Sequence, residues 1–198
     1  MKNLIKTLIV IAIISLSALR SQAQTSNGST GIYLTEQDYK SHKLTYTLSP
    51  TDKMQLNEFL DGKNVTLVYQ GKKLTLPKSG LFGYRLHNQD FRFFHNEAYS
   101  IVDTAGFMLY KKDKLTQQGK GYMPVERYFY SVNLNQSIHE LTIENLWNSF
   151  PGQTGLRYSI QNNFKQDADL AAYDKFAHQY KLKYLYFQQK EVAAHASL

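Results

Sequence analysis

The 198-residue chain contains no cysteine, only four prolines and a single tryptophan. Without cysteine it forms no disulfide, carries no thiol nucleophile and has no attachment site for the lipid of a lipoprotein. Apolar stretches are also short, since the run from Leu8 to Leu19 spans 12 residues. A helix that crosses a bilayer needs about 20 apolar residues. We therefore expect no disulfide, no lipid anchor and no transmembrane segment in the mature chain.

The beginning of the chain has the layout of a secretory signal peptide. Lys2 and Lys6 precede the apolar run, and the small-residue site Ser21-Gln22-Ala23 follows it. We predict cleavage after Ala23, which leaves 175 residues with 20 basic and 16 acidic side chains, so that the net charge falls from +7 to +4. So mild a charge argues against a nucleic-acid partner. The expected product is a soluble exported protein, periplasmic or secreted.

The first half of the mature chain is typical of an antiparallel sheet. Short apolar or alternating runs are separated by Gly, Asn, Asp and Lys, and residues 24–30 form a polar leader before them. We predict about seven to nine short strands, within residues 31–34, 43–48, 65–70, 73–76, 81–87, 91–95, 98–102, 107–111 and 127–133. Ser49 to Leu60 combines a helix-like start with alternation, and we favour a strand there. Gly119-Lys120-Gly121 is expected to be a mobile loop.

After Leu134 the apolar spacing changes to that of helices. Thr142 is a candidate cap for a helix over 141–150, and a second helix fits 156–164. Asp169 is expected to cap a third helix that reaches Tyr180, because apolar residues recur there at steps of three and four. Residues 184–187 fit either a last strand or a helix extension, and 191–198 a frayed tail. Strands followed by helices predict one α+β domain over 31–190.

Several stretches resemble small exported proteins of unknown function that are typical of Bacteroidota. The resemblance is carried by 81–85 (Leu-Phe-Gly-Tyr-Arg), 91–94 (Phe-Arg-Phe-Phe), 99–101 (Tyr-Ser-Ile), 141–146 (Leu-Thr-Ile-Glu-Asn-Leu) and 169–174 (Asp-Leu-Ala-Ala-Tyr-Asp). It covers most of the mature chain and implies an exported protein of one domain. It brings no activity, cofactor or catalytic residue with it.

Most catalytic motifs are missing. His139-Glu140 is followed by Ile143 where a zinc helix needs its second histidine. Only His87 and His95, at the ends of one predicted hairpin, could share a metal, and no third ligand stands at a recognisable spacing. The glycines around Lys120 do not form a phosphate-binding loop. We therefore expect neither a metal nor a cofactor.

Two pairs of acids lie close together in the sequence. A glycosidase needs two carboxyl groups roughly 5 to 9.5 Å apart, which Glu36 with Asp38 or Asp167 with Asp169 could supply. The second pair is better explained as negative charge at a helix N-terminus. A hydrolase acting on envelope polysaccharide or peptide through an acid pair is accordingly the alternative function.

The preferred function is that of a non-enzymatic envelope or secreted protein that binds a partner or an anionic ligand. Arg85 and Arg92 lie on neighbouring predicted strands beside Tyr84, and their guanidinium groups have the planar fork that binds carboxylate or phosphate. Alternatively, these arginines are strand residues with acidic neighbours. Asp103-Thr104-Ala105 matches the acceptor sequence for O-linked sugar in some exported proteins of the group named above, so Thr104 is a candidate modification site.

Overall fold

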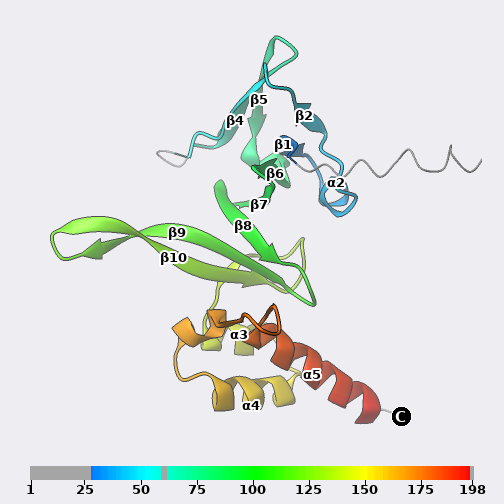
Figure 1. Cartoon of the computed structure of the whole chain (residues 1–198), viewed down its shortest axis with the longest axis vertical. Helices are drawn as coiled ribbons and strands as arrows, with labels where there is room; N and C mark the ends of the chain where they lie inside the picture. Colours follow the sequence, from blue (N-terminus) through cyan, green and yellow to red (C-terminus); the bar gives the residue numbers. More distant parts are fainter. Residues whose placement is uncertain (1–27, 59–61, 197–198) are drawn as a thin grey trace, which may run out of the picture.

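The computed structural model describes residues 28–58 and 62–196, so the predicted signal peptide and most of the leader lie outside the described residues. The predicted α+β class is confirmed. An eight-stranded antiparallel sheet is accompanied by a three-stranded sheet and a small hairpin, and most of the helices follow the strands in the chain (Figure 1). Among the described residues, no helix has both the length and the apolar character that a bilayer crossing requires.

The large sheet has the strand order β11-β10-β9-β8-β7-β6-β1-β2. Its strands are β1 (Thr30–Tyr33), β2 (Tyr46–Leu48), β6 (Gly83–Leu86), β7 (Gln89–Phe94), β8 (Glu97–Asp103), β9 (Met108–Gln118), β10 (Gly121–Ser131) and β11 (His139–Glu140). The three-stranded sheet contains β3 (Lys53–Gln55), β4 (Asn64–Tyr69) and β5 (Lys72–Pro77). The strand favoured within Ser49 to Leu60 is thus present as β3. Tight turns join β6, β7 and β8, and both residues of each turn have positive φ, as two-residue hairpin turns require.

Three helices occupy the C-terminal part, as predicted, and a short one follows β1. They are α2 (Glu36–Lys40), α3 (Ile143–Ser149), α4 (Thr154–Asn163) and α5 (Lys181–Ala196). Two short 3-10 helices are also present, η1 (Lys78–Gly80) and η2 (Asp167–Ala171). The predicted cap of α3 is confirmed, because the Thr142 hydroxyl accepts a hydrogen bond from the Asn145 amide at 3.1 Å.

The helix predicted from Asp169 to Tyr180 is wrong. After η2 the chain forms a hairpin of β12 (Tyr173–Asp174) and β13 (Gln179–Tyr180). The Asp174 carboxylate accepts hydrogen bonds from the amides of Phe176 and Ala177, at 2.8 and 3.0 Å, which closes the turn. Such local side-chain bonds offer the backbone an alternative to a helix. As a result Phe176, one of the apolar residues whose steps of three and four predicted the helix, is fully exposed.

The third helix is instead α5. It includes residues 184–187 and stays helical through residues 191–196, where a frayed tail was expected. Its buried side chains are Leu182, Leu185 and Tyr186, together with the first-turn Lys183. Leu182 and Leu185, three residues apart, therefore lie on one face of the helix, and this face packs on the sheet.

The β9–β10 hairpin is much longer than predicted. The expected strands at 107–111 and 127–133 cover only its base, residues 107–111 and 128–131. The expected loop at 119–121 is its tip, with Gly119 and Lys120 between the strands. Residue pairing is continuous from Met108 with Ser131 to Gln118 with Gly121. Residues 112–127 lack the alternation of apolar residues on which the prediction depended, because little of this part is buried.

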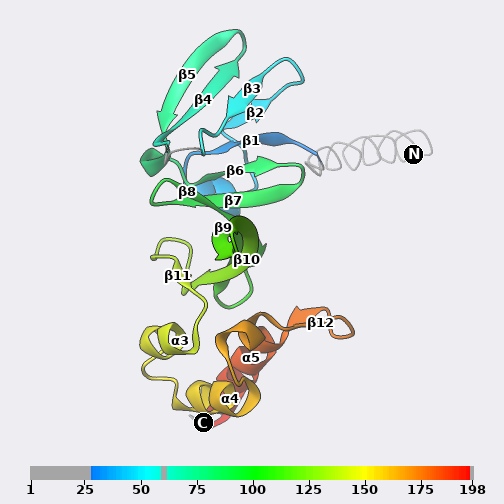
Figure 2. The same ribbon diagram turned by 90° about the vertical axis from the view of Figure 1, so that its left-hand side faces the viewer.

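Two layers cover one face of the large sheet, which we call the Tyr84 face after a residue that points from it. Near β1, β6 and β7 this face packs against Val65 and Leu67 of the three-stranded sheet. Near β9 and β10 it packs against helices α3, α4 and α5, and the two layers lie at opposite ends of the molecule (Figures 1 and 2). The opposite face, which we call the Arg92 face, buries an aromatic cluster that includes Tyr33, Tyr99 and Tyr110.

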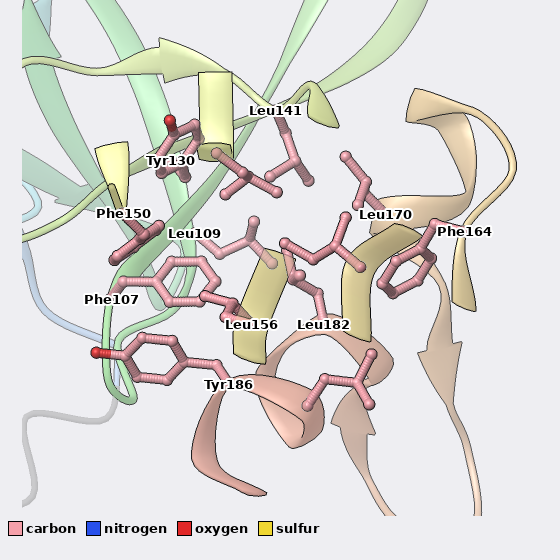
Figure 3. Packing of buried hydrophobic residues seen from close by; sticks show 13 residues of the cluster. Phe107, Leu109, Tyr130, Leu141, Phe150, Leu156, Phe164, Leu170, Leu182 and Tyr186 are labelled. Atoms are coloured by element: carbon pink, nitrogen blue, oxygen red, sulfur yellow. The ribbon is translucent and has the colours of Figure 1, made fainter. Parts of the chain in front are cut away.

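The helical end contains the largest buried cluster. Figure 3 shows side chains of the hairpin base, such as Leu109 and Tyr130, packed among aliphatic and aromatic side chains of the helical segments, such as Leu156, Leu182 and Tyr186. The cluster comprises Phe107, Leu109, Tyr130, Leu141, Leu146, Phe150, Leu156, Ile160, Phe164, Leu170, Leu182, Leu185 and Tyr186. Strands and helices thus share one core, as expected of a single α+β domain.

Candidate ligand groove

Arg85 is bound to an acidic neighbour. Its Nε donates to Asp90 Oδ1 at 2.7 Å and its Nη2 donates to Asp90 Oδ2 at 2.6 Å, across the β6–β7 pair. The Tyr33 hydroxyl also donates to Asp90 Oδ1, at 3.1 Å. This two-pronged arrangement is the strong form of the arginine–carboxylate interaction. The fork that was predicted to receive an anionic ligand therefore already holds a carboxylate of the same chain.

Arg92 is buried, with 6% of its surface exposed. Its Nη1 donates to the Tyr110 hydroxyl at 2.9 Å and to Ser131 Oγ at 3.2 Å, and its Nη2 donates to the Gln136 carbonyl at 2.7 Å. Within the described residues no carboxylate forms an ion pair with it. Arg92 thus ties β7 to the base of the β9–β10 hairpin and to the segment that follows it.

Tyr84 lies on the other face of the sheet from both arginines. Neighbouring residues of a strand point to opposite faces, and the cross-strand pairs place Arg85 with Asp90 and Tyr84 with Phe91. The Tyr84 ring stacks on the Phe91 ring, with centroids 4.6 Å apart and planes within 4°. The structure therefore does not bring Tyr84, Arg85 and Arg92 together into one site.

The other predicted site residues are also separated. His87 and His95 occupy different turns at opposite ends of β7, about 20 Å of strand apart, so they do not face a common metal. Within the described residues no three His, Cys, Asp or Glu side chains form a group suited to a metal ion. Thr104 is exposed in the turn between β8 and β9, where Asp103 Oδ1 accepts a hydrogen bond from the Ala105 amide at 2.8 Å.

The two acid pairs singled out by sequence have structural partners. Asp38 forms a capping box with Thr35 at the start of α2, and Glu36 forms an ion pair with Lys40 at 2.5 Å. Asp167 accepts a hydrogen bond from the Ile143 amide at 2.8 Å. In the same segment, the Asp169 carboxylate accepts bonds from the amides of residues 165 and 166 before η2. These bonds lower the pKa of Asp169, the amide of residue 165 having the largest effect.

A groove of about 830 Å³ lies on the Tyr84 face. Its lining residues come from the segment after β3, from the β7–β8 turn and from strands β6 to β10. The apolar part consists of Leu56, Tyr84, Leu86, Phe91 and Ala98; the charged part of Glu58, Glu97, Lys111, Lys112, Asp113 and Glu126; and the neutral polar part of Gln89, Asn96 and Ser100.

The groove lies where β8 and β9 diverge. Their pairing ends at Ser100 with Lys111, although β8 begins at Glu97 and β9 continues to Gln118. Ala98 and Ser100 line one side of this wedge, while Lys111 and Asp113 line the other. In Figure 1 the two strands separate from this point, β8 toward the three-stranded sheet and β9 away from the body of the protein.

Acidic groups outnumber basic groups in the groove by four to two. Lys112 forms an ion pair with Glu97, and Lys111 Nζ lies 3.1 Å from Glu126 Oε2. The other two carboxylates, Glu58 and Asp113, form no ion pair within the described residues. Glu58 Oε1 lies 3.5 Å from the Tyr84 hydroxyl, its only hydrogen-bond partner among those residues. The lining residues thus have an excess of two acidic groups over basic ones.

Two carboxyl groups of the groove, those of Glu97 and Glu126, are stabilised in their charged form. Hydrogen bonds from Lys111 and Tyr128 lower the pKa of Glu126. Burial by itself would raise the pKa of Glu97, but hydrogen bonds from Lys112 and Tyr99 outweigh it, and the pKa is lowered. A general acid needs the opposite shift, toward a raised pKa. Glu97 and Glu126 therefore lack the raised pKa of a general acid.

Sequence reasoning missed most of the groove residues. Glu58, Asp113 and Glu126 are far apart in the chain, and none belongs to a motif with a fixed spacing. Tyr84 is the one predicted site residue that lines the groove. No protein-family model, curated protein or solved structure matches this chain. Functional inference therefore depends on the groove itself.

Proposed function

We propose that this chain is an exported, non-enzymatic binding protein whose groove takes a ligand that carries positive charge beside an apolar group. The observation that carries the proposal is a pair of carboxylates, Glu58 and Asp113, that form no ion pair among the described residues. They line a groove that also contains the stacked rings of Tyr84 and Phe91. The expectation of an anionic ligand depended on Arg85 and Arg92, which are engaged within the protein. The charge of the groove favours a cation instead.

A short basic peptide has the chemistry that this groove would recognise. Its amines would meet the carboxylates of Glu58 and Asp113, and an aromatic or aliphatic side chain between them would lie over Phe91 and Leu86. Attraction between partly exposed charges weakens as salt screens it. Affinity is therefore expected to fall with ionic strength, while contact with the apolar floor should be less affected.

Calorimetric titration of the full chain tests the proposal with three probe peptides: Lys-Phe-Lys-Phe-Lys, the same peptide with Gln in place of Lys, and the same with Glu. The lysine peptide is expected to bind most tightly. The double variant Glu58→Gln, Asp113→Asn should weaken its binding about tenfold or more, since a hydrogen bond to a charged group contributes roughly 1.5–3 kcal/mol. Glu191→Gln, an exposed site on α5, is the matched control and should bind as the parent does.

Tighter binding of the glutamate peptide, or equal binding by the double variant and the control, would contradict this assignment. Export is tested separately by mass spectrometry of protein recovered from outside the cytoplasm. The recovered chain should begin at Gln24, because cleavage is expected after Ala23. Recovery of a chain that still begins at Met1 would contradict export by a cleaved signal peptide.

A further inference from the structure

The outer part of the β9–β10 hairpin, residues 112–127, extends away from the rest of the protein, and we call it the arm. The pairing of β9 with β8 ends at Lys111, and β10 pairs with β11 only at Phe129 and Tyr130. Figure 1 shows the arm pointing to the left of the body, and Figure 2 views it from its tip. Each strand of the arm therefore pairs on one side only among the described residues.

The outer edge of β10 is blocked at its middle by Pro124, which has no amide hydrogen. The Tyr128 carbonyl accepts a hydrogen bond from the Leu141 amide at 2.9 Å, so the backbone groups of Tyr128 point away from β9. Backbone direction alternates along a strand, and Pro124, four residues earlier, thus also faces outward. A proline at this position costs no bond within the hairpin and discourages the addition of another strand to this edge.

The outer edge of β9 has no such block. Residues 112–118 contain neither proline nor glycine. Because Tyr128 is paired with Lys111, the backbone groups of Lys111 point toward β8, and those of Asp113, Leu115 and Gln117 point in the same outward direction. No strand of the described residues pairs with them. This edge offers a row of amide and carbonyl groups to another strand.

Exposed apolar side chains gather on the same arm. Leu115 and Tyr122 are 73% and 70% exposed, and Met123 is more than half exposed. Two-stranded ribbons without a buried face are marginally stable in water. An added strand would therefore both pair the open edge and cover part of this apolar surface.

We propose that the β9 edge pairs antiparallel with the same edge of a second copy of the chain, around a two-fold axis at Leu115. This register sets Leu115 opposite Leu115 of the partner subunit, and Asp113 opposite Gln117 of the partner subunit. Residues with outward backbone groups then face one another, as an antiparallel ladder requires. Lys114 lies opposite Thr116 of the partner subunit, so no charged side chain faces another of the same sign.

The pairing also brings the tip of the second copy to the groove. Asp113 lines the groove, and in this register the partner's chain runs from Gln117 toward its tip beside Asp113 and Lys111. Between Lys114 and Val125 the arm carries Lys120 but no acid. A positively charged tip thus approaches a groove with two excess negative charges. The second copy completes the open side of the wedge between β8 and β9.

The dimer is expected to be weak, because strands of seven residues bury less surface than a standard stable interface. Sedimentation velocity of the full chain over a wide concentration range should show reversible dimers. Leu115→Pro removes an outward amide from each copy at the centre of the ladder, without removing a bond within the hairpin. It should raise the dissociation constant about tenfold or more. Met123→Thr, which leaves the β9 edge intact, is the control and should still dimerise.

Because the chain has no cysteine, a single introduced cysteine reports its own position. Leu115→Cys should form a disulfide-linked dimer under mild oxidation, since opposite residues of an antiparallel pair lie within disulfide range. Tyr122→Cys, similarly exposed but on β10, should link much more slowly. A chain that stays monomeric at every concentration, or equal linking at both positions, would overturn the proposal.

The pairing does not depend on the ligand proposed for the groove, and the two tests fail separately. A monomer that binds the lysine peptide would overturn the arm pairing and leave the proposed function standing. A chain that dimerises, but whose monomeric Leu115→Pro variant binds no peptide, would overturn the proposed function and leave the arm pairing standing.

Discussion

The base and the arm of the β9–β10 hairpin share one continuous hydrogen-bond ladder. They differ in how far other parts of the protein bury their side chains. In the base, Leu109 is 1% exposed and packs on the helices, whereas Leu115 in the arm is 73% exposed. Both leucines have a paired residue on β10. Backbone pairing thus sets the shape of the whole hairpin, while burial of side chains stabilises only its base.

Polar contacts from other elements also hold the base. Arg92 reaches Tyr110 and Ser131 from β7. From α5, Lys183 Nζ donates to the Ala105 carbonyl at 2.7 Å and to the Phe107 carbonyl, and lies over the Phe107 ring. These two buried cations fix the turn and strands from which the arm projects.

The largest expected difference in stability is between alanine variants of Leu109 in the base and Leu115 in the arm. Leu109→Ala should lower the free energy of unfolding by about 3 kcal/mol, because it leaves a cavity in the core. Leu115→Ala should change it by less than about 0.5 kcal/mol, since its side chain is already in water. Urea denaturation at a concentration where the chain is monomeric measures both. Equal losses would mean that the arm is packed against something.

A second comparison uses two arginines. Arg92→Met keeps most of the buried stem but leaves the Gln136 carbonyl without its donor, and should destabilise the fold by about 2–3 kcal/mol. Arg127→Met, at an exposed position of the arm, should cost less than about 0.5 kcal/mol. The same urea titration applies. A neutral Arg92→Met would show that the buried guanidinium contributes no net stability.

Lys183, which contacts the base, should make the free energy of unfolding depend on pH. Burial lowers its pKa from 10.5 to about 8. Between these values the unfolded chain binds more protons than the folded chain, so the free energy of unfolding should rise with pH, by at most about 1.4 kcal/mol per pH unit. At pH values well below 8 both forms are protonated and Lys183 contributes no slope.

Thermal denaturation between pH 8 and about 9.5 measures this slope. Above that range the buried tyrosines, whose pKa values burial raises, begin to lower the stability as pH rises. Lys183→Met should remove the rise, while Lys190→Met, exposed on the same helix, should retain it. An unchanged slope in Lys183→Met would contradict the assignment to this residue.

The smallest effect is expected at the junction of base and arm. Lys111 and Glu126 form an ion pair at 3.1 Å, and both side chains are partly exposed. Glu126→Gln should therefore cost no more than about 0.5 kcal/mol, and less at high salt. Denaturation at low and high salt measures this. A larger, salt-independent loss would place the edge of the stable base farther out along the hairpin.

Local signals in the sequence were sufficient for much of the fold. Thr142 predicted the start of α3, because a capping hydroxyl acts within three residues. The strands of the three-stranded sheet and of β6 to β8 followed from apolar alternation. The same reasoning failed for the helix after Asp169, where the Asp174 side chain closes a hairpin turn. It also failed for the arm, which has no buried face to impose a pattern.

The candidate site was much less accessible to sequence. Arg85 and Arg92 were recognisable as neighbours on two strands, but an ordinary strand pattern does not reveal that Asp90 and Gln136 already bind them. Glu58 and Asp113 carry no distinctive spacing, so neither was identified. Of the predicted residues, Tyr84 alone lies in the groove.

By itself the sequence determined the α+β class, most strand positions and two of the three C-terminal helices, since these depend on periodicity and capping within a few residues. Tertiary structure alone decided which charges are paired, where β8 leaves β9, and that the groove is acidic. Those features arise from contacts between residues far apart in the chain. Such contacts depend on how the sheets and helices pack, which no local pattern encodes.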